Sequence, residues 1–275
     1  MAVFLALLTA LSYGVADFSG GLAARRTAAL TVTSTAHALG VVGLVLLAAA
    51  VGADDVRSAD LGLGAASGAF GCLGIVLLYR GLAGGRMTVI SPIAAVISAV
   101  LPVVGGLVAG ERPGPTAMVG IVAALAAIAL VSRTGPMGRP DRESLMIACG
   151  AGVGFGTYFL LISGVGEESG LWPLAAGRLV SVLLAASLAT ARHLPVLVPR
   201  AALFLTMAAG LLDVTANVTF LLASQQGLLS IVAVIASLYP AGTVLLAIVV
   251  EDERLSAAQG VGLAAAAAAL VLIAV

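Results

Sequence analysis

One serine of this chain stands in a context that could support nucleophilic chemistry. Ser67 lies in the run GAASGAFGCLG, which extends from Gly64 to Gly74 within an apolar segment. A serine becomes a nucleophile when a neighbouring base, most often a histidine, can accept its proton. The chain has two histidines: His37 precedes the serine, and His193 lies in a polar stretch. The residue types for serine catalysis are therefore present, and their placement decides whether they can work together.

The residues around Ser67 also fit a second interpretation, close packing of helices. Small residues recur along one flank of a helix at Gly64, Ser67, Gly68, Gly71 and Gly74. Such stripes allow a neighbouring helix to approach closely in a membrane. The run is similar to the nucleophile helix of rhomboid intramembrane proteases, but in that family the histidine follows the serine, and His37 precedes it. We favour packing and keep a rhomboid-like serine protease as the alternative.

Charged and titratable residues inside apolar runs are the next candidates for function. Four such residues occur, at Asp17, His37, Arg178 and Asp213. A charge buried in a membrane is costly, so it is usually paired or functional. Asp213 shares one helical face with further small or polar residues, at Thr206, Gly210, Asn217 and Ser224. This face predicts a water-filled cavity, with an interhelical hydrogen-bond cluster as the alternative.

Depth along the helices predicts which of these charges pair. At about 1.5 Å per residue, Arg178 lies roughly 9 Å and Asp213 roughly 13 Å from the same membrane face, whereas Asp17 lies roughly 21 Å from it. Arg178 and Asp213 are thus nearly level on consecutive antiparallel helices, and we expect them to form an ion pair. Asp17, one turn after Tyr13, then becomes a candidate proton carrier, unless it reaches the arginines near its helix end.

His37 lies in a hydroxyl-rich run, TVTSTAHALG, near the start of an apolar segment. The neighbouring hydroxyl groups offer hydrogen-bond partners to an imidazole. We therefore expect a structural histidine near the membrane interface, with a proton relay as the alternative.

The composition places all of these residues in a membrane protein. Of 275 residues, 61% are hydrophobic and 9% are charged, with a mean hydropathy of +1.18 and a formal net charge of zero. A water-facing surface needs more charge than this. The zero net charge gives no sign of a nucleic-acid partner. Because the chain has no lysine, the Gly-x-x-x-x-Gly-Lys phosphate loop of ATP-driven proteins is absent, and we expect neither a cofactor nor a metal.

Apolar runs long enough to cross a bilayer follow one another along the whole chain. Helices that cross the membrane are predicted at 3–24, 31–51, 61–80, 87–109, 116–132, 145–165, 171–191, 201–222, 228–250 and 256–275. The fold class is therefore all-α, with ten transmembrane helices. The first run continues for a full crossing, which favours a spanning helix over a cleaved signal.

The two halves of the chain align without a gap at an offset of 142 residues. The clearest match places the Glu111-Arg112 pair on Glu253-Arg254, in each case before the last helix of its half. This predicts repeats over 1–133 and 145–275, joined by a polar loop over 134–144. Since each repeat has an odd number of crossings, five, the second must enter the membrane from the opposite face. Inverted repeats of this kind are typical of secondary transporters.

Several stretches resemble the EamA-type members of the drug/metabolite transporter superfamily. They are LSYGVADFSGGLAARR, YRGLAGGRMTVISPIAAVISAVLPVVGGLVAGERP and SLYPAGTVLLAIVVEDERLSAAQGVG. The resemblance covers nearly the whole chain as two copies of the domain. It implies that the fourth helix of each repeat lines the central pathway, which makes Ser91, Ser98, Ser237 and Pro240 candidates alongside Tyr13, Asp17, Arg178, Asp213 and Asn217. The second copy keeps the family's proline thirteen residues before the glutamate (Pro240 and Glu253), whereas the first has Ser98 before Glu111.

The combined interpretation is a secondary active transporter or exporter of a small metabolite or drug, with proton coupling through Asp17 as a hypothesis. Its partners would be a small-molecule substrate, protons and the lipid bilayer. The segments 116–132 and 256–275 have no polar interior, which suits packing faces or a homodimer interface. An intramembrane enzyme or a membrane sensor that uses the same bundle is the alternative function.

The arginines predict an orientation in the cell membrane. Ten lie in or beside loops that follow odd-numbered crossings, and two in loops that follow even-numbered ones: Arg25, Arg26, Arg80, Arg86, Arg133, Arg139, Arg142, Arg192, Arg200 and Arg254 against Arg57 and Arg112. Positive residues favour the cytoplasmic side. This predicts both termini outside, although members of the resembled family often have both termini inside.

Overall fold

A computed structural model describes residues 1–83, 87–131, 141–243, 246 and 257–274, and the regular elements among these residues are all helical. The first half contains α1 (Ala2–Ala24), α2 (Ala29–Val51), α3 (Ser58–Ala83), α4 (Met87–Val108) and α5 (Pro115–Val131). The second contains α6 (Arg142–Ile162), the short 3-10 helix η1 (Glu167–Ser169), α7 (Trp172–Ala191), α8 (Arg200–Gln226), α9 (Leu229–Ala236) and α11 (Ala257–Ala274).

Six of these helices are long and apolar enough to cross a membrane: α1, α2, α3, α6, α7 and α8. Shorter apolar helical segments lie at Ile93–Val108, Pro115–Leu130, Leu229–Thr243 and Gly260–Ile273. With many apolar helices in a chain of this composition, the protein is a polytopic membrane protein.

Most predicted segments agree with observed helices to within three residues at each end, and two differences have a clear local cause. The helix α6 begins at Arg142 rather than at 145, because the Asp141 carboxylate accepts a hydrogen bond from the Ser144 amide at 2.9 Å and caps the helix. The helix α8 continues to Gln226 rather than ending at 222, because no residue that disfavours a helix follows 222 until Gly227.

The helix predicted over 228–250 is interrupted. The helix α9 ends at Ala236, a turn occupies Ser237 and Leu238, and helical structure resumes over 239–243. Pro240 has no N–H to bond the carbonyl of Ala236, and its ring crowds that carbonyl, so a break one turn before it is the expected result. Residues 244–245 and 247–250 of the predicted segment lie outside the described residues, as do Glu253 and Arg254 beyond it.

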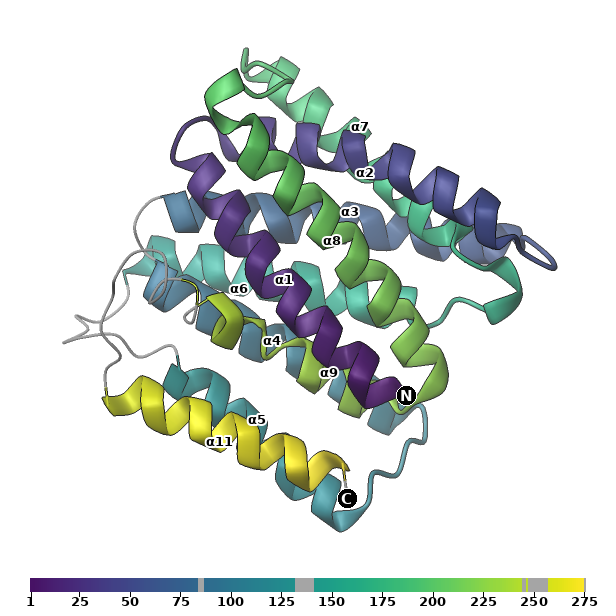
Figure 1. Ribbon diagram of the computed structural model, residues 1–275, viewed down its shortest axis with the longest axis vertical. Helices are drawn as coiled ribbons and strands as arrows, with labels where there is room; N and C mark the ends of the chain where they lie inside the picture. The colour runs from purple at the N-terminus through teal and green to yellow at the C-terminus, as the bar shows by residue number, and fades with distance from the viewer. Residues whose placement is uncertain (84–86, 132–140, 244–245, 247–256, 275) are drawn as a thin grey trace.

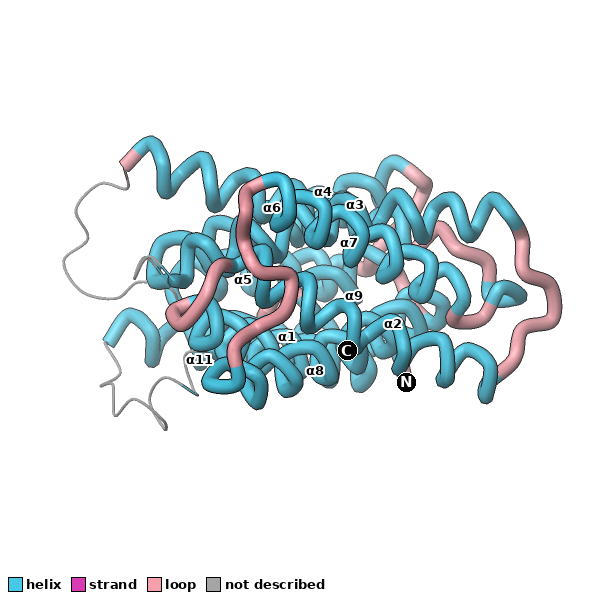
Figure 2. The backbone as a smooth tube through the Cα atoms, turned by 90° about the horizontal axis from the view of Figure 1, so that it is seen from above, coloured by secondary structure: helices cyan, strands magenta, loops and turns pink. Residues whose placement is uncertain are grey.

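The helices form one bundle in which their axes run broadly along a common direction, and both chain termini lie at the same end (Figure 1). We call this the termini end. The opposite end, which we call the arginine end, carries Arg25, Arg26, Arg80, Arg192 and Arg200 at helix boundaries or in loops. The view from above in Figure 2 shows loops joining the helices at the two ends of the bundle.

Helices from the first half pack mainly against helices from the second. The helix α1 lies on α8 and α3 lies on α6, while α2 packs on α7, α4 on α9 and α5 on α11. At one edge of Figure 1, α5 and α11 run side by side. The helix α6 also packs extensively on α4, and α7 on α3, so the interior of the bundle is shared by both halves.

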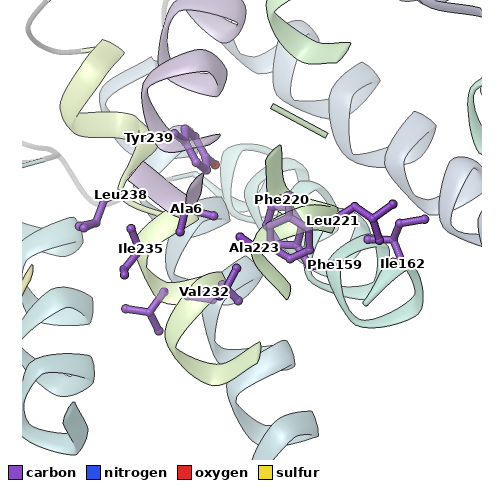
Figure 3. Packing of buried hydrophobic residues seen from close by; sticks show 14 of the residues in the cluster. Ala6, Phe159, Ile162, Phe220, Leu221, Ala223, Val232, Ile235, Leu238 and Tyr239 are labelled. Carbon is purple, nitrogen blue, oxygen red and sulfur yellow. The ribbon is translucent and has the colours of Figure 1, made fainter. Parts of the chain in front are cut away.

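Part of the apolar core is shown in Figure 3. The rings of Phe159 and Phe220 stack with centroids 4.3 Å apart, and Val232 and Ile235 of α9 belong to the same buried cluster as Ala6 of α1. The cluster joins α1, α6, α8 and α9, and so holds the helices that surround the polar residues described below.

The small residues of α3 pack closely against other helices, as the sequence predicts. A Cβ atom at Gly68 would collide with the carbonyl oxygen of Gly177, and one at Gly64 would collide with that of Pro173, both in α7. Ser67 donates its hydroxyl hydrogen bond to the carbonyl of Gly64 at 2.7 Å. Gly64 and Gly68 thus allow close packing of α3 on α7, and Gly74 allows the same on Phe155 of α6.

The segments α5 and α11 also pack on each other. Ala124 is fully buried, and a Cβ atom at Gly120 would lie 3.0 Å from the carbonyl oxygen of Ala269. The packing role is confirmed, whereas a homodimer through the outer faces of these helices remains a prediction.

Candidate functional site

A small polar cavity lies between helices of both halves. Its volume is about 40 Å³. Side chains that line it come from α1, α2, α3, α6, α7 and α8, and the polar ones are Tyr13, His37, Ser67, Tyr158, Arg178, Ser181, Asp213 and Asn217. This volume holds only one or a few water molecules. In this conformation the cavity is therefore too small for a metabolite.

The centre of the cavity is an ion pair between Arg178 of α7 and Asp213 of α8. Only 8% and 13% of the two side-chain surfaces are exposed. The pair confirms the prediction from helix depth. Because both charges are removed from solvent, each satisfies the other, and loss of either one would leave an uncompensated charge.

His37 belongs to this centre. Its Nε2 lies 3.9 Å from Oδ2 of Asp213, and its Nδ1 lies 2.6 Å from Oγ of Ser181. It is thus a hydrogen-bonded histidine, as the sequence predicts, and it lies two turns inside α2, whereas its place relative to the membrane interface stays a prediction. The nearby hydroxyls do not bind it, since Thr31 and Thr35 donate to the carbonyls of Pro195 and Val196 in the α7–α8 loop.

Asn217 extends the polar network from Asp213 to two tyrosines. Its amide nitrogen donates to Oδ2 of Asp213 at 3.0 Å. Its Oδ1 accepts from the hydroxyl of Tyr13 at 2.8 Å and from that of Tyr158. Asp213 and Asn217 are four residues apart and so share one face of α8. These bonds give α1, α6, α7 and α8 one connected set of polar side chains.

Only part of the polar face predicted on α8 reaches the cavity. Thr206 and Ser224 donate to the carbonyls of Ala202 and Leu221 in their own helix. A Cβ atom at Gly210 would lie 2.7 Å from a carbonyl oxygen of α2, so this glycine serves helix contact. The extended water-filled face is therefore wrong, because serine and threonine hydroxyls bond readily to carbonyls one turn back.

Asp17 is a buried carboxylate that lies apart from the ion pair. It is 5% exposed, and no hydrogen bond or ion pair reaches it from the residues that the structure describes. Arg26, a candidate partner from the sequence, donates instead to the carbonyl of Ala201. Arg178 pairs with Asp213, and no ion pair between Arg178 and Asp17 is found among the described residues, as the depth argument predicts.

The residues implied by resemblance on α4 and after α9 lie elsewhere. Ser98 donates to the carbonyl of Ala95 at 2.9 Å, and its Oγ lies 3.2 Å from Oγ of Ser237. Ser91 and Pro240 are buried, and none of these four residues lines the central cavity. Ser98 and Ser237 form a contact between the two halves, and the place of all four residues in a pathway remains a prediction.

The carboxylate of Glu111, at the termini end, is a structural residue that is not among the site residues predicted from the sequence. Glu111, between α4 and α5, accepts hydrogen bonds from the amides of Leu229 at 2.6 Å and Ser230 at 3.0 Å, and so caps α9. The repeated glutamate-arginine pair was the sequence signal for it. Its counterpart Glu253 lies outside the described residues.

The same end is held by a second set of contacts between loops of the two halves. Ser169 donates to Oδ2 of Asp60 at 2.6 Å and accepts from the amide of Arg57 at 3.1 Å. The guanidinium of Arg57 pairs with Glu168. The α2–α3 loop and the α6–α7 loop are thus joined over this end of the bundle.

Comparison with known proteins gives a family for the first half and a fold for the whole chain. Residues 1–133 match the EamA-like transporter family, which belongs to the drug/metabolite transporter superfamily. No curated protein matches the chain. A solved crystal structure is similar to it with a TM-score of 0.80 and 17% identity, over 100% of this chain and 98% of the other. At that identity the likeness shows the fold alone.

Proposed function

Because residues 1–133 match the EamA-like transporter family, we propose that the protein is a secondary active transporter or exporter of a small metabolite or drug that works by alternating access. The observation that carries the proposal is the enclosed Arg178–Asp213 pair, at a cavity bounded by helices of both halves. Charges inside a membrane bundle mark substrate or ion pathways, and sites at the interface of two repeats are typical of secondary transporters.

The proposed architecture is ten crossings in two inverted repeats, over 1–133 and 145–275. It is supported by the family match, which ends at residue 133. It is also supported by the packing, since α1 on α8 corresponds to α6 on α3 when each helix is exchanged for its repeat partner. The contacts α2 on α7, α4 on α9 and α5 on α11 join partners to each other.

The size and the charges of the cavity suggest which kind of substrate the transporter would bind. A cavity of about 40 Å³ is too small for a metabolite, so it would have to expand to admit a substrate. Arg178 and Asp213 neutralise each other, and Asn217 and the tyrosines add neutral polar groups. We therefore favour a small polar substrate that is neutral or zwitterionic over one with a large net charge.

Proton coupling, as part of the same proposal, would use Asp17. A buried carboxylate without a fixed partner can take up and release a proton as the cavity changes sides. Asp17 fits this description, since it is 5% exposed and no hydrogen bond or ion pair reaches it from the residues that the structure describes.

Transport itself tests the proposal. Metabolites that differ between cells overexpressing the protein and cells lacking it would be radiolabelled and offered to proteoliposomes. We expect counterflow of at least one of them into vesicles preloaded with the unlabelled compound, and its loss in Arg178→Gln. Absence of counterflow for all nominated compounds, with folded protein in the vesicles, would refute a transport function.

A further inference from the structure

An apolar groove opens at the arginine end of the bundle, apart from the central cavity. Its volume is about 680 Å³. The walls are mainly α3 and α7, with the α1–α2 connection beside them, and we call it the α3–α7 groove. The residues that carry the argument are Ala69, Leu73, Leu77 and Arg80 of α3, and Leu184, Leu188 and Arg192 on the α7 side.

The groove runs along the helices with its charges at one end. Arg80 and Ala69 are eleven residues apart on α3, which corresponds to roughly 16 Å of helix. That length is close to half of the hydrocarbon thickness of about 30 Å, and so to one leaflet. Side chains between these two positions, Leu73 and Leu77, are apolar and face the groove. The shape suits an extended acyl chain with its polar end beside the arginines.

The two arginines give the mouth of the groove a positive charge. Arg192 directly follows the last residue of α7 and is exposed. Among the residues that the structure describes, no hydrogen bond or ion pair holds its guanidinium. Arg80 bonds to Glu143 at 3.2 Å, and about three fifths of its side-chain surface remains exposed, at 59%. The residues lining the groove include no aspartate or glutamate. An anion at the mouth would therefore meet one free guanidinium and one that is partly neutralised.

We propose that the α3–α7 groove is a binding site for an anionic phospholipid. One acyl chain lies between α3 and α7, and the headgroup phosphate is bound by Arg192, with Arg80 beside it. Arginine suits this role because its planar guanidinium can donate two parallel hydrogen bonds to phosphate oxygens. Basic pockets between membrane helices are a known means of recognising anionic headgroups.

Native mass spectrometry of the full-length protein tests the site. The detergent-purified protein is mixed with phosphatidylglycerol or with phosphatidylcholine of the same acyl chains. We expect the anionic lipid to be retained more strongly. We expect Arg192→Gln to weaken its binding on the order of fivefold, which is the contribution of one arginine near an anionic surface. Ala69→Phe, which fills the groove, should weaken binding without any change of charge.

Arg200→Gln is the matched control, because it removes one exposed charge from the same end but not from the groove. It should leave binding of the anionic lipid within twofold of the unmodified protein. Equal retention of the two lipids would overturn the proposal, as would equal losses in Arg192→Gln and Arg200→Gln. Displacement of the lipid by millimolar inorganic phosphate would show a simple anion site and would also overturn it. Each variant is compared only if its thermal unfolding matches that of the unmodified protein.

Discussion

Arg178 and Asp213 form an ion pair across neighbouring helices in the middle of the bundle, almost out of contact with solvent. Removing one partner should therefore cost about 3–5 kcal/mol of stability, because the remaining charge stays buried. We expect Arg178→Ala to lower the unfolding temperature strongly, and Asp213→Asn added to it to restore much of the loss. Thermal unfolding in detergent measures this. If the double variant is less stable than both single variants, then Arg178 and Asp213 are not each other's main partners.

Asp17→Asn separates proton coupling from substrate handling. The amide has nearly the same size as the carboxylate but carries no exchangeable charge. We expect uptake driven by a pH gradient to be lost in proteoliposomes, while exchange of labelled for unlabelled substrate continues. Asp17→Glu is the control and should keep some pH-driven transport. Normal pH-driven transport by Asp17→Asn would rule out this residue as the proton carrier.

Glu111 holds the start of α9 from a loop of the other half. Glu111→Ala removes the acceptor for two backbone amides and should destabilise the protein by about 1–2 kcal/mol. Amide hydrogen exchange at the start of α9 should rise, as measured by mass spectrometry. The exposed Glu167 is the control, since its replacement by alanine removes the same charge at the same end. Similar exchange in both variants would contradict a specific capping role.

The α5–α11 contact predicts opposite outcomes for two alanines. Ala124 is fully buried, so Ala124→Leu overfills the contact and should cost about 1–3 kcal/mol. Ala264 is exposed, so Ala264→Leu should leave stability unchanged and alter the oligomeric state if that face joins two copies. Light scattering together with thermal unfolding distinguishes the two effects. Neither variant should change which substrate is transported, and a changed substrate profile would contradict a purely structural role.

The excess of arginine at one end predicts that this end faces the cytoplasm and that both termini face outward. Figure 1 shows the two termini at the same end of the bundle, so one fusion reports on both. An alkaline phosphatase fused at the C-terminus should be active, and a green fluorescent protein fused there should be dark. The reverse result would place the arginine end outside.

The sequence alone determined the membrane class, the helical segments and the partnership of Arg178 with Asp213. These features follow from properties that are local or regular: hydropathy sets which segments enter the bilayer, and a fixed rise per residue sets the depth of each charge. Close packing by the glycines of α3 was predicted for the same reason, since its spacing is visible along one helix.

Only the tertiary structure decided which face of each helix meets which neighbour. His37, Tyr158 and Ser181 join the cavity because α2, α6 and α7 turn those faces toward it, and rotation about a helix axis leaves hydropathy unchanged. Thr206 and Ser224 are excluded from it because their hydroxyls bond within α8. The cap of Glu111 on α9 and the groove between α3 and α7 join parts of the chain more than one hundred residues apart, and such contacts arise only when the two halves pack together.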